Sequence, residues 1–221
     1  MRYAIVDQIR GIAIVLMIIF HFNYDLRLFN LSPTANDQKW FWWGLPRIIV
    51  FLFLFSMGIS LCLAHSKGIR WKKFNKRLAQ IVLGAIAISV TTYFLYPKNW
   101  VYFGTLHCIA VTSLMALPLL KYPKTSLALS ILIVIPILFG LKYPWIILGH
   151  KSMDYIPAIP WISVVLLGVY IHSLRLHERI KLPDFKVFSP LKYLGEHSLI
   201  IYLIHQPILF GLAWLIHQVL K

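Results

Sequence analysis

The sequence predicts an all-α membrane protein, a polytopic helix bundle of about seven transmembrane helices. Of its 221 residues, 59% are hydrophobic and 13% are charged, whereas a soluble domain carries about 25% charged residues. The mean hydropathy is +0.74. A soluble core of this length cannot bury so much apolar surface. The composition therefore excludes a soluble enzyme, a soluble nucleic-acid-binding domain and a disordered tail.

Apolar segments of membrane-spanning length recur along the chain. A helix crosses the hydrocarbon core with about 20 apolar residues. Seven segments meet or approach this requirement: 8–28, 45–64, 78–96, 101–120, 126–142, 157–174 and 198–219. Pro136 and Gly140 interrupt the fifth segment, which a membrane helix tolerates when neighbouring groups satisfy the freed backbone. Since no repeat or soluble domain interrupts the series, we predict a single domain over residues 1–221.

Basic residues alternate between the two sides of these segments. The formal net charge is +15. Fifteen of the 22 Lys and Arg residues lie on one side of the series: Arg2, Arg10 at the start of the first segment, and thirteen in the loops 65–77, 121–125 and 175–197. Because cytoplasmic loops carry the excess of Lys and Arg, the N-terminus is predicted in the cytoplasm and the C-terminus outside. The same distribution favours membrane lipids, and not nucleic acid, as the partner of the positive charge.

Four ionisable residues in or directly before the first segment share one face of the predicted helix. At about 100° per residue, Arg10 lies about −60° from Asp7, and His21 about −40°. Asp25 returns to about 0° and lies roughly 27 Å along the helix axis from Asp7. Ionisable groups are costly in the membrane, so this polar stripe is predicted to face protein or a water-filled cavity. The alternative is a polar seam that only joins helices.

The two ends of the polar stripe suit different chemistry. Arg10 lies at the predicted cytoplasmic end, where a guanidinium group suits a phosphate. His21 and Asp25 lie near the outer end, one turn apart. A carboxylate at this spacing can hold one ring nitrogen of His21 and leave the other free as a general base. We therefore interpret His21 and Asp25 as candidate catalytic residues, with Asp7 and Arg10 at an anion site.

Other polar residues in or near the apolar segments are weaker candidates. His107 and His205 are either hydrogen-bonded packing histidines or part of the site. Arg47 is a further candidate, with outward extension to the membrane interface as its alternative. Lys72 and Lys73 belong to a cationic cluster that marks topology and also suits an acidic cofactor. The sequence shows no metal-ligand spacing, so we predict no metal site.

Five short motifs follow one another along the chain. The first is Val6-Asp7-Gln8-Ile9-Arg10-Gly11-Ile12-Ala13, followed eleven residues after the arginine by His21. The others are Phe55-Ser56-Met57-Gly58-Ile59-Ser60, Phe103-Gly104-Thr105-Leu106-His107, Pro160-Trp161 with Gly168, and Leu194-Gly195-Glu196-His197-Ser198 with Tyr202-Leu203-Ile204-His205-Gln206-Pro207. In this order, the motifs resemble the heparan-alpha-glucosaminide N-acetyltransferase family and its small bacterial relatives within the transmembrane acyltransferase superfamily.

The resemblance implies transfer of an acetyl group from cytoplasmic acetyl-CoA to an amine or hydroxyl of a sugar-type acceptor at the outer side. By analogy, Arg10 binds a CoA phosphate, and His21 deprotonates the acceptor. His107 and His205 line the tunnel or position the thioester. The expected location is the bacterial cytoplasmic (inner) membrane, and a homodimer is compatible with the exposed apolar surface.

Two alternatives to this enzyme follow from the residues alone. A proton-coupled small-molecule transporter would use the Asp7, Arg10, His21 and Asp25 stripe as a proton relay, although inverted repeats typical of such proteins are not evident. A non-catalytic scaffold would use the same stripe for helix assembly. The transporter predicts substrate flux without CoA, and the scaffold predicts that Arg10 and His21 substitutions damage folding.

Overall fold

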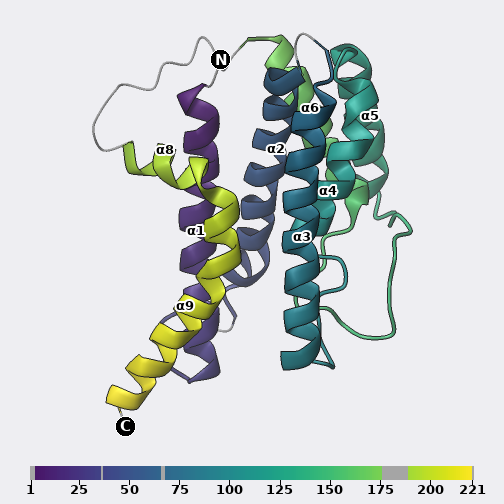
Figure 1. Cartoon of the computed structure of the whole chain (residues 1–221). Helices are drawn as coiled ribbons and strands as arrows, with labels where there is room; N and C mark the ends of the chain where they lie inside the picture. The colour runs from purple at the N-terminus through teal and green to yellow at the C-terminus, as the bar shows by residue number, and fades with distance from the viewer. Residues whose placement is uncertain (1–2, 36, 66–67, 176–188, 221) are drawn as a thin grey trace. The chain divides into compact units, whose positions relative to one another are not determined.

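The computed structural model describes residues 3–35, 37–65, 68–175 and 189–220, and within these ranges the fold is helical and contains no β-strand (Figure 1). This confirms the predicted all-α class. The helices are α1 (Ala4–Leu28), the π-helix η1 (Trp40–Gly44), α2 (Leu45–His65), α3 (Trp71–Leu95), α4 (Thr105–Ala116), the 3-10 helix η2 (Leu117–Leu119), α5 (Pro123–Leu138), α6 (Ala158–Ser173), α8 (Ser189–Glu196) and α9 (Ser198–Val219).

Each predicted apolar segment overlaps one apolar helix, or in the case of residues 101–120 the helix α4 continued by η2. Four helices are long and apolar enough to cross a membrane: α1, η1 continued by α2, α3 and α9. The shorter apolar helices are α4 with η2, α5 and α6. The helix α5 ends at Leu138, before the predicted end, because Gly140 adopts a φ of 80°. Its left-handed conformation suits a glycine after a helix.

The helix α8 differs from the prediction, which treated residues 175–197 as a loop. It has 8 residues, too few to cross the membrane and therefore invisible to a search for apolar spans. Pro190 lies in its first turn, where proline is well tolerated because the missing N–H has no helical partner. Residues 176–188 of this predicted loop lie outside the described residues.

The chain forms two compact units. The α1 unit comprises Tyr3–Phe53 and Leu182–Lys221, and the α3 unit comprises Leu54–Lys181. The helix α2 therefore contributes its first part to the α1 unit and its remainder to the α3 unit. The prediction of a single functional domain over residues 1–221 stays a prediction.

In the α1 unit, α1 contacts both α8 and α9 (Figure 1). One face of α1 packs on η1 and the start of α2. The buried residues of this apolar core are Ala13, Ile14, Met17, Phe41, Leu45, Ile49 and Phe53.

Two glycines allow the backbones of α1 and α8 to approach closely. A Cβ atom added at Gly11 of α1 would collide with the carbonyl group of Leu191 in α8. A Cβ atom added at Gly195 of α8 would collide with the carbonyl group of Asp7 in α1. Small residues at such contacts permit close backbone packing in membrane proteins. The short helix α8 is thereby held against the first half of α1.

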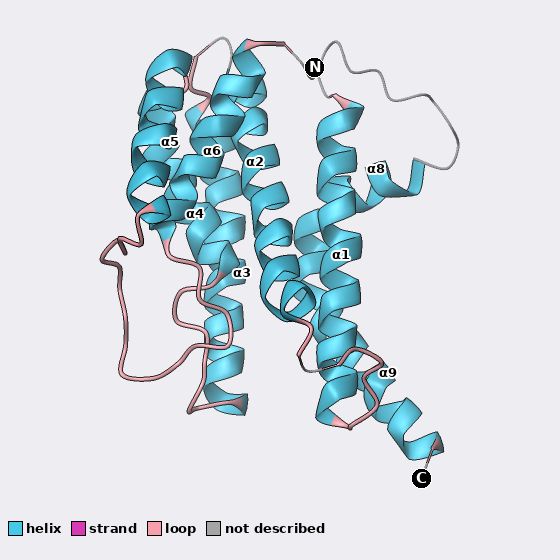
Figure 2. Ribbon diagram, turned by 180° about the vertical axis from the view of Figure 1, so that it is seen from behind, coloured by secondary structure: helices cyan, strands magenta, loops and turns pink. Residues whose placement is uncertain are grey.

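In the α3 unit, α4 contacts α3 and α6, and α5 packs on α6 (Figure 2). The hydroxyl of Ser130 in α5 donates a hydrogen bond to the carbonyl oxygen of Ser163 in α6, at 2.8 Å. The glycine pair Gly58 and Gly168 brings α2 and α6 close together in the same way as the pair in the α1 unit. Glycine contacts and buried serine hydrogen bonds therefore supplement apolar packing in this unit.

Candidate active site

The polar stripe of α1 faces the interior, as the sequence predicted. Asp7 and Asp25 are buried, and Asp25 is completely inaccessible to solvent. The exposed apolar residues of the helix lie on another face: Ile12 is 40% exposed and Ile19 is 45% exposed. At about 100° per residue, both point about 120–140° away from Asp7. The exposed face of α1 therefore carries isoleucine side chains, which suit lipid, and the ionisable groups lie on another face.

Asp7 and Arg10 form an ion pair at the start of α1. The Nη1 atom of Arg10 donates to Oδ1 of Asp7 at 3.1 Å. The side chain of Arg10 is 14% exposed and that of Asp7 is 4% exposed. The predicted anion site therefore holds a guanidinium that is partly neutralised by its own carboxylate.

His21 lies against a histidine from the last helix. The ring centroids of His21 in α1 and His205 in α9 are 4.8 Å apart, and the rings meet edge to face at 68°. The edge of Phe20 contacts His21 at 5.4 Å. The fold therefore brings the predicted general base and one predicted cofactor-binding histidine together, 184 residues apart in the sequence.

The hydrogen bond of His205 fixes its tautomer. Its Nδ1 atom lies 2.7 Å from the carbonyl oxygen of Tyr202. A carbonyl oxygen only accepts hydrogen bonds, so Nδ1 must carry the proton. The neutral imidazole then has an unprotonated Nε2. That nitrogen is buried and has no hydrogen-bond partner among the described residues.

Asp25 is held by the residue that follows His205. The side-chain amide Nε2 of Gln206 donates to Oδ1 of Asp25 at 2.8 Å. This bond joins the second half of α1 to α9. The predicted pairing of Asp25 with His21 stays a prediction, whereas the Gln206 bond is an interaction that sequence reasoning missed. The only signal for Gln206 was its place in the last motif, beside His205.

Three buried acceptor atoms of this cluster lack a hydrogen-bond partner in the described part of the chain. They are Oδ2 of Asp25, Oε1 of Gln206 and Nε2 of His205. An unsatisfied buried polar atom costs about 1–3 kcal/mol, and native proteins hold few of them without a functional reason or a bound water. They belong to three residues joined to one another or adjacent in the chain, one of which, His205, contacts the ring of His21. We call Asp25, His205 and Gln206 the α9 cluster.

His107 lies in the α3 unit, where both ring nitrogens make hydrogen bonds. Its Nδ1 accepts from the backbone N–H of Gly104 at 3.2 Å, so Nε2 carries the proton of the neutral ring. That Nε2 lies 3.2 Å from the hydroxyl of Ser89, which itself donates to the carbonyl oxygen of Val101 at 2.6 Å. These bonds connect α3 to the start of α4 and give His107 a structural role.

The remaining candidate cations are exposed. Lys72 and Lys73 lie in the first turn of α3, in the α3 unit. Arg47 of α2 lies in the α1 unit, where its guanidinium carbon is 3.7 Å from the ring centroid of Trp43. It also donates to the carbonyl oxygen of Trp43 at 2.6 Å. The Arg47 guanidinium is therefore held against Trp43 of η1.

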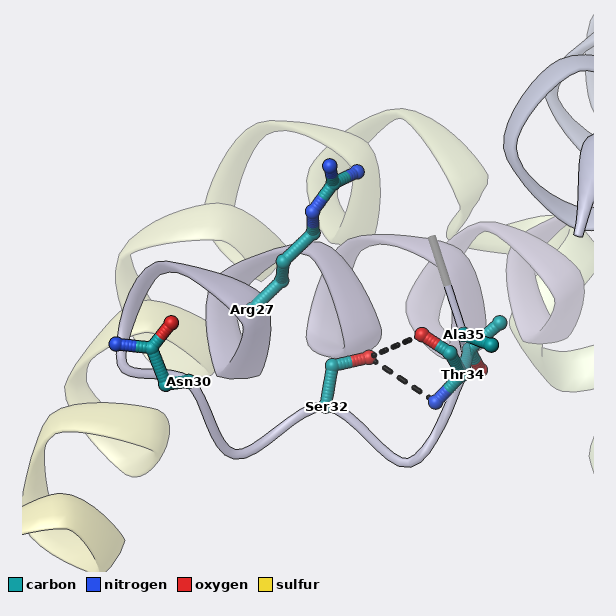
Figure 3. A pocket seen from close by; sticks show the side chains of 5 residues that line it. All are labelled: Arg27, Asn30, Ser32, Thr34 and Ala35. Carbon is teal, nitrogen blue, oxygen red and sulfur yellow. Dashed lines mark hydrogen bonds between the residues drawn. The ribbon is translucent and has the colours of Figure 1, made fainter. Parts of the chain in front are cut away.

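A shallow hollow lies just after α1 in the α1 unit (Figure 3). It is lined by Arg27, Asn30, Ser32, Thr34 and Ala35. The backbone N–H of Thr34 donates to the hydroxyl of Ser32 at 3.2 Å, and the Ser32 hydroxyl lies 2.9 Å from Oδ1 of Asn23. These bonds order the loop that follows α1, which sequence reasoning did not single out.

Apolar helices that bury the Asp25 carboxylate and the His205 imidazole, and partly bury Gln206 and His21, define an integral membrane protein with a polar internal cluster. The particular family follows from its sequence: residues 2–207 match the family described as heparan-alpha-glucosaminide N-acetyltransferase, catalytic. The match spans nearly the whole chain, so the protein belongs to this family. Membership implies a transmembrane acetyltransferase. No curated protein and no solved structure matches the chain.

Proposed function

We propose that the protein transfers an acetyl group from cytoplasmic acetyl-CoA to an amine or hydroxyl of a sugar-type acceptor at the outer side of the membrane. Two findings support this proposal: the family membership, and the cluster of buried polar groups around His21. The cluster is the observation that carries the assignment of the site, because unsatisfied buried atoms beside an imidazole suit a reacting polar ligand.

His21 is the proposed general base. A thioester is already activated, so the enzyme must align donor and acceptor and remove one proton. His21 takes the proton from the acceptor N–H or O–H while that nitrogen or oxygen attacks the thioester carbonyl. The carbon–sulfur bond breaks, and the CoA thiolate recovers the proton from the histidinium. A positioned base contributes about 10²–10⁴-fold, and alignment contributes up to about 7–11 kcal/mol. Asp25 is proposed to orient this ring.

Basic residues are the proposed partners of the CoA phosphates. Arg10 is the first candidate because a guanidinium can bind two phosphate oxygens at once. Its ion pair with Asp7 would then be exchanged for, or shared with, a phosphate. Lys72, Lys73 and Arg47 are further candidates. For His107, a tunnel-lining role remains part of the proposal, although its two ring nitrogens are already engaged within the α3 unit.

The membrane setting of the proposal follows from the charge distribution. We place the N-terminus in the cytoplasm and the C-terminus outside, with seven helices crossing the bacterial cytoplasmic membrane. The three shorter apolar helices complete this number. Membrane lipids are the surrounding partner, and a homodimer is compatible with the large exposed apolar surface.

One observation favours a second candidate, a proton-coupled transporter. The polar stripe covers roughly 27 Å of α1 from Asp7 to Asp25 and includes His21. The ring of His21 contacts the ring of His205, and these two imidazoles could carry protons. In that case the substrate itself would cross the membrane and CoA would be unnecessary.

Proteoliposomes separate the two candidates. Acetyl-CoA that carries a label in its acetyl group is placed inside the vesicles, where it reaches one face of the protein. Glucosamine or glucose is added outside, at the other face. The acetyltransferase predicts labelled acetyl product on the acceptor side only when acetyl-CoA is present. Flux of unmodified sugar without acetyl-CoA, together with no acetylated product, would contradict the proposal and support the transporter.

A further inference from the structure

The hydrogen-bonding character of the α9 cluster can be assigned atom by atom. The amide nitrogen of Gln206 donates to Asp25, so the unpartnered atom of this side chain is its carbonyl oxygen, which only accepts. The Nδ1–H of His205 donates to Tyr202, so its unpartnered Nε2 also accepts. The second carboxylate oxygen of Asp25 joins them as an acceptor when the carboxyl group is ionised.

All three atoms are therefore acceptors, and a ligand that fits them must present hydrogen-bond donors. A thioester has a carbonyl oxygen and a sulfur, and both only accept. An acetyl-CoA thioester placed against these atoms would leave them unsatisfied, at a cost of about 1–3 kcal/mol for each buried group. Amines and hydroxyls supply donors, and a polyhydroxylated or amino sugar presents several of them together.

We propose that Asp25, His205 and Gln206 bind the acceptor substrate, and that the acetyl donor approaches His21 from elsewhere. This inference rests on the proposed function and deepens it. It assigns His205, for which the family resemblance implied tunnel lining or positioning of the thioester, to the acceptor. The ligand chemistry is an N–H or O–H group flanked by further donors, whether it comes from an amino sugar or from a neutral sugar.

The arrangement also explains why Gln206 follows His205 directly. Adjacent residues of a helix point about 100° apart, so the two side chains contact different groups of α1. Gln206 contacts Asp25, and the ring of His205 contacts the ring of His21. A ligand donor bound between these side chains would lie next to the proposed base.

Two variants of the full chain in lipid nanodiscs test the inference. Gln206→Met removes the amide at nearly constant volume, and His205→Phe removes Nε2 while the Gln206–Asp25 bond can persist. The matched control is Gln8→Met, because Gln8 is also a buried glutamine of the α1 unit with an unpartnered Oε1. Size-exclusion profiles and apparent Tm values establish that each variant is folded.

Binding and turnover are measured separately for each ligand. The Kd of acetyl-CoA is determined by calorimetry. Glucosamine serves as the amine probe and glucose as the hydroxyl probe, and the Kd and KM of each sugar are determined. We expect Gln206→Met and His205→Phe to keep the acetyl-CoA Kd within about twofold and to raise the KM of the accepted probe about 10- to 100-fold. The Gln8→Met control is expected to resemble the wild type.

Different results overturn different statements. If the two variants weaken acetyl-CoA binding tenfold while the acceptor KM stays unchanged, the cluster holds the thioester and the inference is wrong. Unchanged values for both ligands, or a wild-type chain that binds neither probe, would also contradict it. A chain that binds a probe through His205 and Gln206 but transfers no acetyl group would preserve the acceptor site and contradict the proposed function.

Discussion

At the scale of single residues, Asp154 shows how one partly buried carboxylate organises a helix start. Its Oδ2 accepts hydrogen bonds from the backbone N–H of Thr105 at 2.8 Å and from the Thr105 hydroxyl at 3.1 Å. These bonds satisfy donors in the first turn of α4, which otherwise have no helical partner. Asp154 lies in the segment between α5 and α6, outside the predicted spans.

The titration of Asp154 gives a pH prediction. Burial raises the pKa of Asp154 above its ordinary value of 3.8, and the hydrogen bonds from Thr105 only partly oppose this effect. The folded chain then binds this proton more tightly than the unfolded chain, so the contribution to stability decreases as the pH rises from 3.8 through the folded-state pKa. We expect Asp154→Asn to remove this decrease. The measurement is the apparent Tm between about pH 4 and pH 8, a range that begins near the ordinary pKa of an aspartate.

The control for this measurement is Asp37→Asn, because Asp37 is an exposed aspartate of the other unit. An Asp154→Asn variant whose apparent Tm follows the same pH profile as the wild type and the Asp37→Asn control would show that Asp154 is not responsible.

Residue roles along one helix could be predicted from the sequence, whereas partners from distant segments could not. The interior position of Asp7 and Asp25 follows from the 100° periodicity of α1. The partner of Asp25 could not be predicted this way, because Gln206 is 181 residues away and sequence spacing carries no information about α9 packing. The partners of His107 could not be predicted either, because its bond to Ser89 depends on how α3 packs against α4 and its bond to Gly104 on the local structure at the start of α4.

At the scale of elements, the contact between α1 and α8 depends on two glycines. A methyl group at Gly11 or Gly195 would collide with a backbone carbonyl of the other helix, which cannot move aside as a side chain could. Overpacking of this kind typically costs about 1–3 kcal/mol. We therefore expect Gly11→Ala and Gly195→Ala to lower the apparent Tm and to loosen α8, as measured by hydrogen exchange of its amides.

Gly211→Ala is the matched control. Gly211 lies within α9, and a Cβ atom added there meets nothing within 4 Å. Alanine is favoured over glycine in a helix by about 0.5–1 kcal/mol, so this variant is expected to be neutral or slightly more stable. Equal destabilisation by all three substitutions would contradict the close-packing account.

The existence of the apolar helices could be predicted, but some of their ends could not. Composition and length identify each apolar segment because lipid tolerates little else. The helix α3 starts at Trp71, before the predicted residue 78. Its first turns are charged, so they form part of the helix but not part of the apolar span. The helix α8 was not predicted because it contains no long run of apolar residues. Its packing depends on the glycine pair Gly11 and Gly195, which a search for apolar segments does not detect.

At the scale of the whole molecule, the charge distribution predicts the orientation of the chain. Lys98 follows α3 and Lys124 begins α5, and both are exposed. The prediction places Lys98 outside and Lys124 in the cytoplasm. We expect an impermeant maleimide to label Lys98→Cys in intact cells and Lys124→Cys only after the membrane is opened.

The unmodified chain provides the control, because its two cysteines, Cys62 and Cys108, are buried. The reverse labelling pattern would mean an inverted orientation. Labelling of both positions from outside would mean that α4 does not cross the membrane, and the prediction of seven spans would be wrong.

The central claim concerns the cluster at His21, and the most direct test is His21→Ala in the purified chain. His217→Ala is the matched control, since His217 is a histidine of α9 that stacks on Phe29 away from the proposed chemistry. We predict that His21→Ala keeps the acetyl-CoA Kd of the wild type and lowers the rate of acetyl transfer by about 10²–10⁴-fold, while His217→Ala remains active. Unchanged turnover in His21→Ala would contradict the account.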